Sequence, residues 1–568
     1  MKGDRFSLLG KIFSLFFLIV TLRLFQIQII MADEFKAQAQ IQYQSFDQIT
    51  PRRGNILTSD GYSVASSLPN YLLFADPQIL NNDPLLVGKK LVDSLFENAS
   101  PSAKAVEMEK LVSLLGQKKL RWVPLENKLE ETDKHKIEAL GIKGLGFEEQ
   151  SMRFYPESSL AAQILGFTGK DETGEEKGYF GLEGYYNLDL TSSPGSLSQE
   201  KDPLGRPIAI GYQKLEKARG GRTLVTSIDR TAQYLIEKRL AQGLEKYGAK
   251  AGTVSVMEPQ TGRILAMASL PSYSPADYFK TDPSLFKNPI VSETYEPGST
   301  FKVLVMAAAF NENIVTPDSR CDKCSGPRAI DKYLIRTWDN KYRPNATMSE
   351  IIEHSDNVGM VYVAEKMGTE KFLKYYKLFG LNELTGVDLE EEANPPYKPD
   401  DKWTYIDRAT ASFGQGIVVT PIQMLRAVGA LANNGRLMTP RVVDKIQDGN
   451  KFLDIPFAPG RQVIETKSIE QIKEIMVRAV DNGEAKWAKP KDFKIAGKTG
   501  TAQIAVSGHY DETKTIASFV GFAPADHPRF VMLVTLREPQ SSQWGSETAA
   551  PLWFGIAKDL FRLWNITP

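Results

Sequence analysis

Three short polar motifs in the second half of the chain constrain its fold more than any other feature. They are Ser299-Thr300-Phe301-Lys302, Ser355-Asp356-Asn357 and Lys498-Thr499-Gly500. Together they supply a nucleophile, groups that can transfer protons and a strand that can bind an anion. Each motif alone is short and common, and it is their ordered combination that predicts a catalytic cleft.

The first motif lies at the start of a predicted buried helix. Ser299 follows Glu296-Pro297-Gly298 and precedes an apolar run over residues 301–310, and Pro and Gly are typical of such a helix start. Free backbone N–H groups and the positive end of the helix dipole favour an oxyanion there. Lys302 lies one turn further on the same face, so its amine can reach the hydroxyl. The alternative is a capping serine with a solvated lysine.

Lys302 could accept the serine proton only if it were neutral. A lysine with an unperturbed pKa of about 10.4 is charged at neutral pH. Desolvation by the apolar helix would lower this pKa, and so would a second cation, for which Lys498 is the candidate.

The second motif interrupts two predicted helices, one over residues 348–353 and one over residues 358–378. The side chains of such a connector are free to face a cleft. Ser355 can relay a proton between Lys302 and a leaving group, and Asn357 can hold a substrate amide. The alternative is a simple helix cap.

The third motif lies in a predicted strand. The strand covers residues 494–506, and it is followed by a turn over 507–512 and by strands over 515–523 and 530–537. Gly500 leaves room for a ligand backbone, so an acyl-peptide could lie along this strand as an added strand. Lys498 and the hydroxyls of Thr499 and Thr501 would bind a carboxylate.

The three motifs match the S-x-x-K, S-D-N and K-T-G set of penicillin-binding proteins and class A β-lactamases. Over nearly its whole length the chain resembles a class B penicillin-binding protein, a membrane-anchored D,D-transpeptidase that cross-links peptidoglycan. Glu296-Pro297-Gly298-Ser299-Thr300 resembles the division type more than the elongation type. The resemblance implies a covalent acyl-enzyme that β-lactams also form, and no cofactor or metal. It implies catalytic roles for Ser299, Lys302, Ser355 and Asn357, and substrate binding by Lys498, Thr499, Gly500 and Thr501.

Two earlier segments resemble motifs of the family's pedestal domain. Pro51-Arg52-Arg53-Gly54-Asn55-Ile56 resembles R-G-x-I, although Thr58-Ser59-Asp60-Gly61 replaces the usual D-R-N-G and still predicts a turn. Gly178-Tyr179-Phe180-Gly181-Leu182-Glu183 resembles G-x-x-G-x-E. We predict that Arg53 and Glu183 form a buried ion pair that locks the pedestal to the catalytic domain. Gly414-Gln415-Gly416 resembles a family segment that borders the cleft.

The N-terminus predicts a membrane anchor. Residues 12–32 are mostly apolar, with Arg23 as their one charge, and they follow Lys2, Arg5 and Lys11. About 20 apolar residues span a bilayer, and flanking cations stay in the cytoplasm. We therefore expect one span in the cytoplasmic (inner) membrane, with the bulk of the chain outside the cytoplasm. A cleaved signal peptide is the alternative, with Ala37-Gln38-Ala39 as its only small-x-small site.

Composition excludes several other classes of function. Sixty-nine basic residues balance sixty-nine acidic ones. The sequence has no basic stripe of the kind that would indicate nucleic-acid binding. The four histidines are scattered and form no metal motif. Cys321 and Cys324 cannot close a zinc site alone, so we expect a local disulfide in preference to a redox centre.

The expected fold is a multidomain α+β chain. Residues 1–11 form a cytoplasmic tail, 12–32 the membrane helix, 33–220 an elongated pedestal, and 221–568 a transpeptidase domain whose antiparallel sheet has helices on both faces. Its partners would be peptidoglycan stem peptides, β-lactams, the membrane, a membrane glycosyltransferase and other division proteins. Alternative functions are an elongation-type transpeptidase, a β-lactamase, and a noncatalytic β-lactam sensor or division scaffold.

Overall fold

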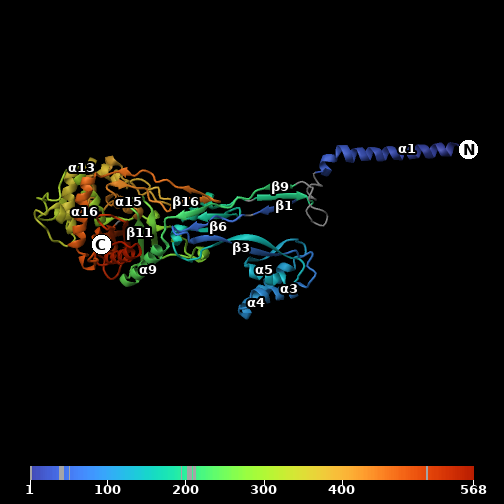
Figure 1. The fold of residues 1–568 in the computed structure, drawn as a ribbon, viewed down its shortest axis with the longest axis horizontal. Helices are drawn as coiled ribbons and strands as arrows, with labels where there is room; N and C mark the ends of the chain where they lie inside the picture. The colour runs from blue at the N-terminus through green and yellow to red at the C-terminus, as the bar shows by residue number, and fades with distance from the viewer. Residues whose placement is uncertain are drawn as a thin grey trace. The chain divides into compact units, whose positions relative to one another are not determined.

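The computed structural model describes residues 3–36, 44–49, 51–193, 195–200, 208, 213–506 and 509–567. Its internal contacts divide the chain into two units, which are described separately. One unit comprises residues 1–52 and 192–221, and the other comprises residues 53–191 and 222–568. Figure 1 shows the helices and strands of both.

The first unit contains the predicted anchor. Helix α1 (Gly3–Phe25) continues into a short π-helical segment, η1 (Gln26–Ile30). The stretch Ser7–Ile30 is long and apolar enough to cross a membrane. Arg23 donates a hydrogen bond to Oε1 of Gln26 at 2.8 Å, so its charge has a polar partner on the same helix.

A small antiparallel sheet completes the first unit. Its strand order is β1-β8-β9, with β1 spanning Gln44–Ile49, β8 Gly195–Glu200 and β9 Gln213–Glu216. Residues 37–43 and 50 of the expected pedestal range, and the alternative cleavage site at Ala37-Gln38-Ala39, lie outside the described residues.

The second unit begins with a seven-stranded sheet. Its order is β17-β16-β10-β2-β3-β4, and β5 also pairs with β3. The strands are β2 (Ile56–Leu57), β3 (Ser63–Ala75), β4 (Val123–Leu129), β5 (Leu145–Phe154), β10 (Thr223–Thr226), β16 (Val443–Asp448) and β17 (Lys451–Asp454). Because β10 pairs with β2 in parallel, this sheet takes strands from both sides of the domain boundary expected at residue 220.

Three helices cover part of this sheet. Helices α3 (Pro84–Leu95), α4 (Pro101–Leu115) and α5 (Glu131–Glu138) bury Leu91, Leu111 and Ile137 in one core with Leu73 of β3. Asp83 and Ser100 cap the first two helices through their side chains, which satisfies backbone N–H groups left open at a helix start.

The turn predicted at Thr58–Gly61 is also present, with Gly61 at a φ of 81°.

The predicted buried ion pair is present, and it has a third member. Nε of Arg53 donates to Oε2 of Glu183 at 2.7 Å, and Nε of Arg153 donates to Oε1 at 2.6 Å. A Cβ on Gly178 would lie 1.9 Å from the Glu183 carbonyl oxygen, so only glycine allows this approach. All these residues lie within 53–183. The cluster therefore fastens segments of the N-terminal region to one another, and the expected lock onto the catalytic domain is wrong for this pair.

One of the contacts with the catalytic region is made by a different carboxylate. The hydroxyl of Tyr186 donates to Oδ2 of Asp388 at 3.0 Å. Asp388 also accepts the backbone N–H groups of Val442 and Val443 at 2.6 and 2.8 Å. A single buried aspartate thus joins the N-terminal region to the start of β16.

The catalytic region is built on a five-stranded antiparallel sheet, as predicted. Its order is β12-β11-β21-β20-β19, which leaves β19 at one edge. The strands are β11 (Ala251–Met257), β12 (Ile264–Leu270), β19 (Ala496–Val506), β20 (His509–Ala523) and β21 (Phe530–Arg537). Strand β20 begins earlier than the predicted residue 515, because the β19–β20 pairing continues past a register shift after Gln503 to Val506 and His509.

Helices cover both faces of this sheet. Met532 and Val534 pack against α9 (Arg230–Tyr247) and α17 (Ala549–Leu563), whereas Val531 and Leu533 belong to the core on the other face. That second core contains α11 (Lys302–Asn311), α13 (Asn357–Leu378), α15 (Pro421–Leu431) and α16 (Thr466–Asp481). Helix α11 is buried from residue 302 to residue 310, as expected for a helix that is apolar all round.

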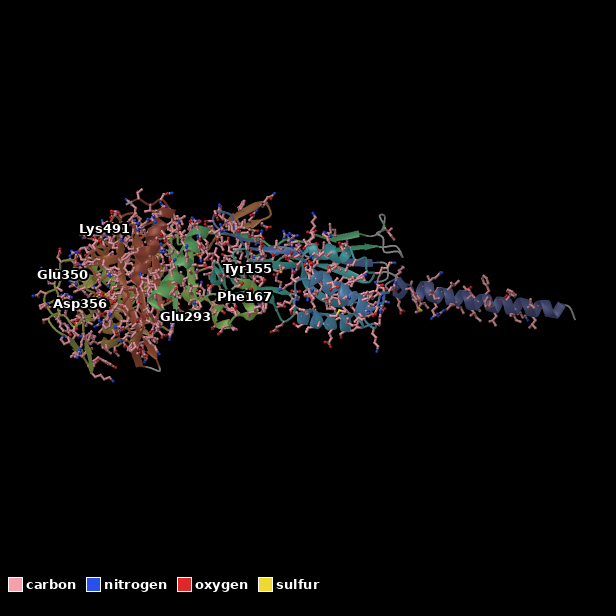
Figure 2. The ribbon with its side chains drawn as sticks, turned by 90° about the horizontal axis from the view of Figure 1, so that it is seen from below. Tyr155, Phe167, Glu293, Glu350, Asp356 and Lys491 are labelled. Atoms are coloured by element: carbon pink, nitrogen blue, oxygen red, sulfur yellow. A yellow bond between two sulfur atoms is a disulfide. The ribbon has the colours of Figure 1, made fainter. Side chains whose placement is uncertain are left out.

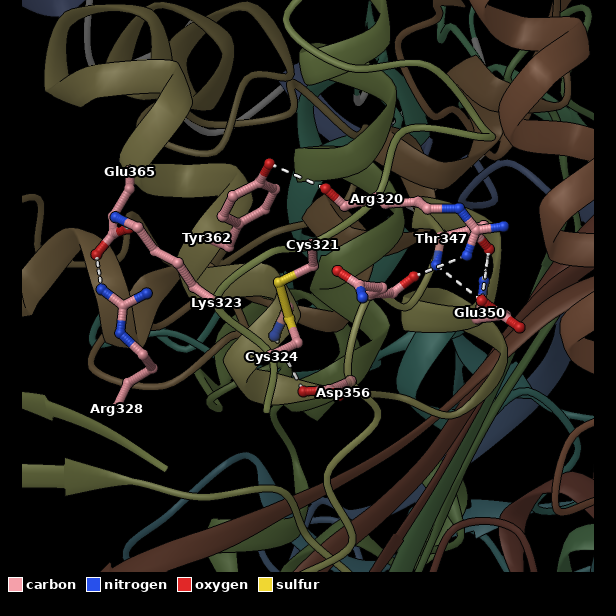
Figure 3. Close-up of a disulfide and its surroundings, with 12 residues drawn as sticks. Arg320, Cys321, Lys323, Cys324, Arg328, Thr347, Glu350, Asp356, Tyr362 and Glu365 are labelled. Carbon is pink, nitrogen blue, oxygen red and sulfur yellow. Dashed lines mark hydrogen bonds and ion pairs between the residues drawn. A yellow bond between two sulfur atoms is a disulfide. The ribbon is translucent and has the colours of Figure 1, made fainter. Parts of the chain in front are cut away.

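The two cysteines form the expected disulfide, which Figure 3 shows. Both side chains are buried. The backbone N–H of Cys321 donates to the carbonyl of Ala346 at 2.9 Å, and the hydroxyl of Tyr362 donates to the carbonyl of Arg320 at 3.1 Å. The disulfide therefore holds a loop against the helices that follow it.

Candidate active site

The three motifs meet at one cleft of about 580 Å³. Residues from all three line it, namely Ser299, Ser355, Asn357, Thr499, Gly500 and Thr501. Lys302 and Lys498 lie behind its wall, with 0% and 4% of their surface exposed. The fold thus gathers every predicted site residue from helix, connector and strand.

Ser299 lies in a short 3₁₀ turn, η4 (Gly298–Phe301), that leads into α11. Gly298 has a φ of 54°, and its N–H donates to the carbonyl of Gly414 at 3.0 Å. A Cβ on Gly414 would lie 2.1 Å from the Gly298 carbonyl oxygen. Two glycines are therefore needed to bring the Gly414–Gly416 segment against the serine turn, and Gln415 of that segment lines the cleft as expected.

The amine of Lys302 is held by the second motif. Nζ donates to the carbonyl oxygen of Ser355 at 2.6 Å and to Oδ1 of Asn357 at 2.7 Å, and it lies 3.3 Å from Oγ of Ser355. Within the described part of the chain, the hydroxyl of Ser299 makes no hydrogen bond, so the expected serine–lysine contact is not formed here. Catalytic hydrogen bonds often tighten only when substrate binds.

Two buried lysines set the electrostatics of the site. Burial, and then the nearby charge of Lys498, hold the pKa of Lys302 well below its usual range. Burial lowers the pKa of Lys498 to about 8, against the opposing effect of Glu484. The two predicted causes, desolvation and a second cation, therefore both act on Lys302.

The second motif lies between α12 (Met348–Glu353) and α13, where the sequence predicted a break. Ser355 has a φ of 55°, a conformation that few residues other than glycine adopt. Asp356 caps α13 by accepting the N–H of Gly359 at 3.0 Å. Nδ2 of Asn357 donates to the carbonyl of Arg336 at 3.1 Å, so its amide is fixed in the orientation that faces Lys302.

The third motif lies on the edge strand β19. A Cβ on Gly500 would come within 2.5 Å of Oγ of Ser518 and 2.8 Å of Cγ2 of Thr300. The glycine is thus required for the strand to pack on the serine turn, a reason that differs from the expected space for a ligand backbone. Lys498 donates to Oγ1 of Thr499 at 3.2 Å, and Oγ1 of Thr501 accepts the N–H of Gly545 at 3.0 Å.

Several cleft residues were not predicted from the sequence. Trp338 and Trp544 face each other edge to face with ring centroids 5.2 Å apart, and both line the cleft with Glu484. Burial raises the pKa of Glu484, while Lys498 and Lys302 oppose that rise. These residues come from separate loops with no local motif, and a contact between two tryptophans so far apart in the sequence can be found only once the fold is known.

Comparisons with known proteins agree with this architecture. The penicillin binding protein transpeptidase domain matches residues 252–562, and the penicillin-binding protein dimerisation domain matches residues 48–226. Stage V sporulation protein D of Bacillus subtilis (strain 168) is 33% identical over 97% of this chain and 84% of its own length. Peptidoglycan D,D-transpeptidase FtsI of Escherichia coli (strain K12) is 28% identical over 99% of this chain and 92% of its own.

Solved structures show the same fold. Penicillin binding protein 2X from Streptococcus thermophilus superposes with a TM-score of 0.77 at 22% identity, covering 91% of this chain and 80% of that one. A peptidoglycan synthetase from Bifidobacterium adolescentis superposes with a TM-score of 0.73 at 25% identity, covering 92% of this chain and 97% of that one. The chain belongs to the penicillin-binding protein transpeptidase family, and its paired dimerisation and transpeptidase domains make it a class B member.

Proposed function

We propose that this class B penicillin-binding protein cross-links peptidoglycan stem peptides by acyl transfer through Ser299. The serine oxygen attacks the carbonyl of the penultimate D-Ala of one stem peptide, and the terminal D-Ala leaves with a proton. An amine from a neighbouring stem peptide then attacks the acyl-enzyme, which forms the cross-link and frees the serine. A β-lactam acylates the same oxygen and stays attached.

The observation that carries this proposal is the position of Lys302. A neutral amine has two N–H groups and one lone pair. The carbonyl oxygen of Ser355 and Oδ1 of Asn357 accept two hydrogen bonds from Nζ at 2.6 and 2.7 Å. Neutral Lys302 can therefore satisfy both acceptors and keep its lone pair for the proton of Ser299.

Ser355 and Asn357 then have different tasks. The Ser355 hydroxyl, 3.3 Å from Nζ, can pass the proton from Lys302 to the leaving amine. Both polar ends of the Asn357 side chain are already engaged, one by Lys302 and one by Arg336. We therefore assign Asn357 to holding Lys302, and its expected contact with a substrate amide stays a prediction.

The edge of β19 supports peptide binding. Because β19 pairs with β20 alone among the strands that the structure describes, its outer edge can pair with an extended peptide. Backbone N–H groups of Ser299 and Thr501 would hold the oxyanion. Lys498, with Thr499 and Thr501, would bind the substrate carboxylate.

We further propose a role in septal synthesis, with the N-terminal helix as a single membrane span whose N-terminus lies in the cytoplasm. Support for the division type comes from Glu296 of the E-P-G-S-T segment. Its Oε1 accepts hydrogen bonds from the N–H of Gly416 at 3.0 Å and the hydroxyl of Tyr510 at 2.9 Å, so this residue braces the cleft wall. A cross-linking enzyme also needs glycan strands, which a membrane glycosyltransferase and other division proteins would supply.

Labelling of the full-length protein with a fluorescent penicillin tests the proposal. The wild type and Ser102→Ala, a surface control, should give equal gel bands, and Ser299→Ala should give none. A labelled Ser299→Ala would contradict the assignment, and rapid nitrocefin turnover by the wild type would favour a β-lactamase. Restored division by Ser299→Ala in a depleted strain would favour a noncatalytic scaffold. Rescue of cell elongation without rescue of septation would favour the elongation type.

A further inference from the structure

A second cavity, of about 420 Å³, shares no lining residue with the catalytic cleft. Its walls come from β3, β5, β6 (Phe167–Lys170) and a 3₁₀ segment, η2 (Pro275–Lys280), that follows β12. Tyr155 and Phe167 mark this region in Figure 2. The cavity therefore lies where the range of the dimerisation domain meets that of the transpeptidase domain.

Four buried polar atoms of residues that line this cavity lack a hydrogen-bond partner within the described residues. They are Oδ1 of Asn70, Oγ of Ser151, Nη2 of Arg153 and the hydroxyl of Tyr155. Arg153 and Tyr155 are only 7% and 6% exposed. Burying such groups without a partner is unfavourable, so their gathering beside one cavity indicates a ligand that pairs with them.

The charge of the neighbouring cluster of Arg53, Arg153 and Glu183 indicates the chemical class of this ligand. Two buried guanidinium groups, of Arg53 and Arg153, share the single carboxylate of Glu183. No other carboxylate in the described part of the chain forms an ion pair with either of them. The two guanidinium groups therefore share one counter-charge within ion-pair distance, with Glu176 acting on both from further away, and a buried charge is unfavourable unless it is closely paired.

The rest of the Arg153 side chain is fixed. Nε donates to Glu183, and Nη1 donates to the carbonyl of Gly54 at 2.6 Å and to Oγ of Ser67 at 3.2 Å. Only Nη2 is left without an acceptor among the described residues. A donor of this kind is already oriented, so it loses little entropy when it binds an anion.

The other charged groups on the wall do not cancel this preference. Lys128 and Lys170 add positive charge, and Glu176 is the one carboxylate that lines the cavity. Burial raises the pKa of Glu176, and the charges of Arg53 and Arg153 oppose that rise. Across the cavity, η2 contributes an aromatic surface: Tyr278 stacks on Phe167 with centroids 4.2 Å apart, and Phe279 is 63% exposed.

We propose that this cavity binds an oxyanion, either a carboxylate or a phosphate group, on a compact molecule whose apolar face rests on Tyr278 and Phe279. Nη2 of Arg153 and the Tyr155 hydroxyl donate to the oxyanion. The site is independent of Ser299 and its chemistry.

Isothermal titration calorimetry on the full-length Ser299→Ala protein in detergent micelles tests this proposal. The probes are N-acetylmuramate, N-acetylglucosamine and inorganic phosphate. Saturable one-site binding of N-acetylmuramate, with none of N-acetylglucosamine, supports a carboxylate on a ring. Binding of phosphate with none of N-acetylmuramate supports a phosphate-bearing ligand. Equal binding of the two sugars, or binding of no probe, overturns the proposal.

Variants locate the site. Tyr155→Phe removes one hydroxyl and keeps the ring, and it should weaken binding about tenfold, as expected for the loss of a hydrogen bond to a charged group. The matched control is Tyr273→Phe, because Tyr273 is also buried but its hydroxyl already donates to the carbonyl of Ala162. Arg153→Lys should abolish binding if it folds. Unchanged affinity in Tyr155→Phe would show that the probe binds elsewhere and overturn the proposal.

Discussion

Nζ of Lys302 lies 2.7 Å from Oδ1 of Asn357, although the two residues belong to different helices. This contact, with the one to the Ser355 carbonyl, fixes the amine beside the serine turn. It joins two separate motifs into one hydrogen-bonded unit.

Replacing Lys302 should abolish rapid acylation without unfolding the protein. Lys302→Met removes the proton acceptor, and Lys302→Arg keeps a charge that does not deprotonate in this range. Both should be acylated by penicillin about a hundredfold more slowly or worse, as measured by stopped-flow or quenched-gel kinetics. Lys366→Met, a change outside the cleft, is the control. Near-normal acylation of folded Lys302→Met would shift the base to Ser355, His354 or solvent.

The acylation rate should depend on pH through both lysines. Because the pKa of Lys302 is depressed, the neutral base is gained as pH rises through that lowered value. Lys498 has a pKa of about 8, so its cation, and the binding of a β-lactam carboxylate, are lost above that pH. The second-order rate constant should therefore rise and then fall. Lys498→Arg should remove the alkaline fall. A pH-independent rate would contradict both assignments.

Glu183→Gln should strongly destabilise the protein. It leaves the guanidinium groups of Arg53 and Arg153 buried without a counter-charge, which costs about 3–5 kcal/mol. The matched control is Glu107→Gln, in a partly exposed surface pair with Lys110, where the cost should be below about 1 kcal/mol. Urea unfolding of the two variants gives the comparison, and equal stabilities would refute the buried cluster.

The Cys321–Cys324 disulfide should be dispensable for catalysis. It closes a very short loop, so it constrains little unfolded-chain entropy, and double replacement by serine should cost at most a few kcal/mol. Thermal unfolding and penicillin labelling measure the two effects. A well-folded double variant that is not acylated would point to redox control.

The membrane span should contribute more than anchoring. Replacing residues 12–32 with an unrelated apolar helix should preserve penicillin labelling and impair septation, because Arg23 and its neighbours would no longer be available to partner helices. Microscopy of complemented cells measures the septal defect. Normal division with the replaced span would remove the case for a specific role.

Local sequence patterns were sufficient for much of the fold. The break at Ser355 and the strand limits of β21 follow from hydrophobic periodicity and turn residues. The sheet to which β10 belongs could not be predicted this way. Its pairing with β2 and β16 depends on contacts across more than a hundred residues, for which a single sequence carries no signal.

The residues of the candidate site fall into the same two groups: those that local patterns predict and those that only the tertiary fold reveals. Motif residues were predictable because their spacing along helix and strand is chemically specific. Arg153, Glu484 and the Trp338–Trp544 pair were not, since each acts through neighbours that only the tertiary fold provides. Gly500 was predicted to allow a close approach by a ligand backbone, whereas the groups that approach it are Ser518 of β20 and Thr300 of the serine turn.

The most direct test of the central claim is peptide mapping by mass spectrometry after brief exposure of the full-length protein to benzylpenicillin. The account predicts a single penicilloyl adduct on the peptide that contains Ser299, and on its side-chain oxygen. An adduct on Ser355 or on any other residue, with Ser299 unmodified, would contradict it.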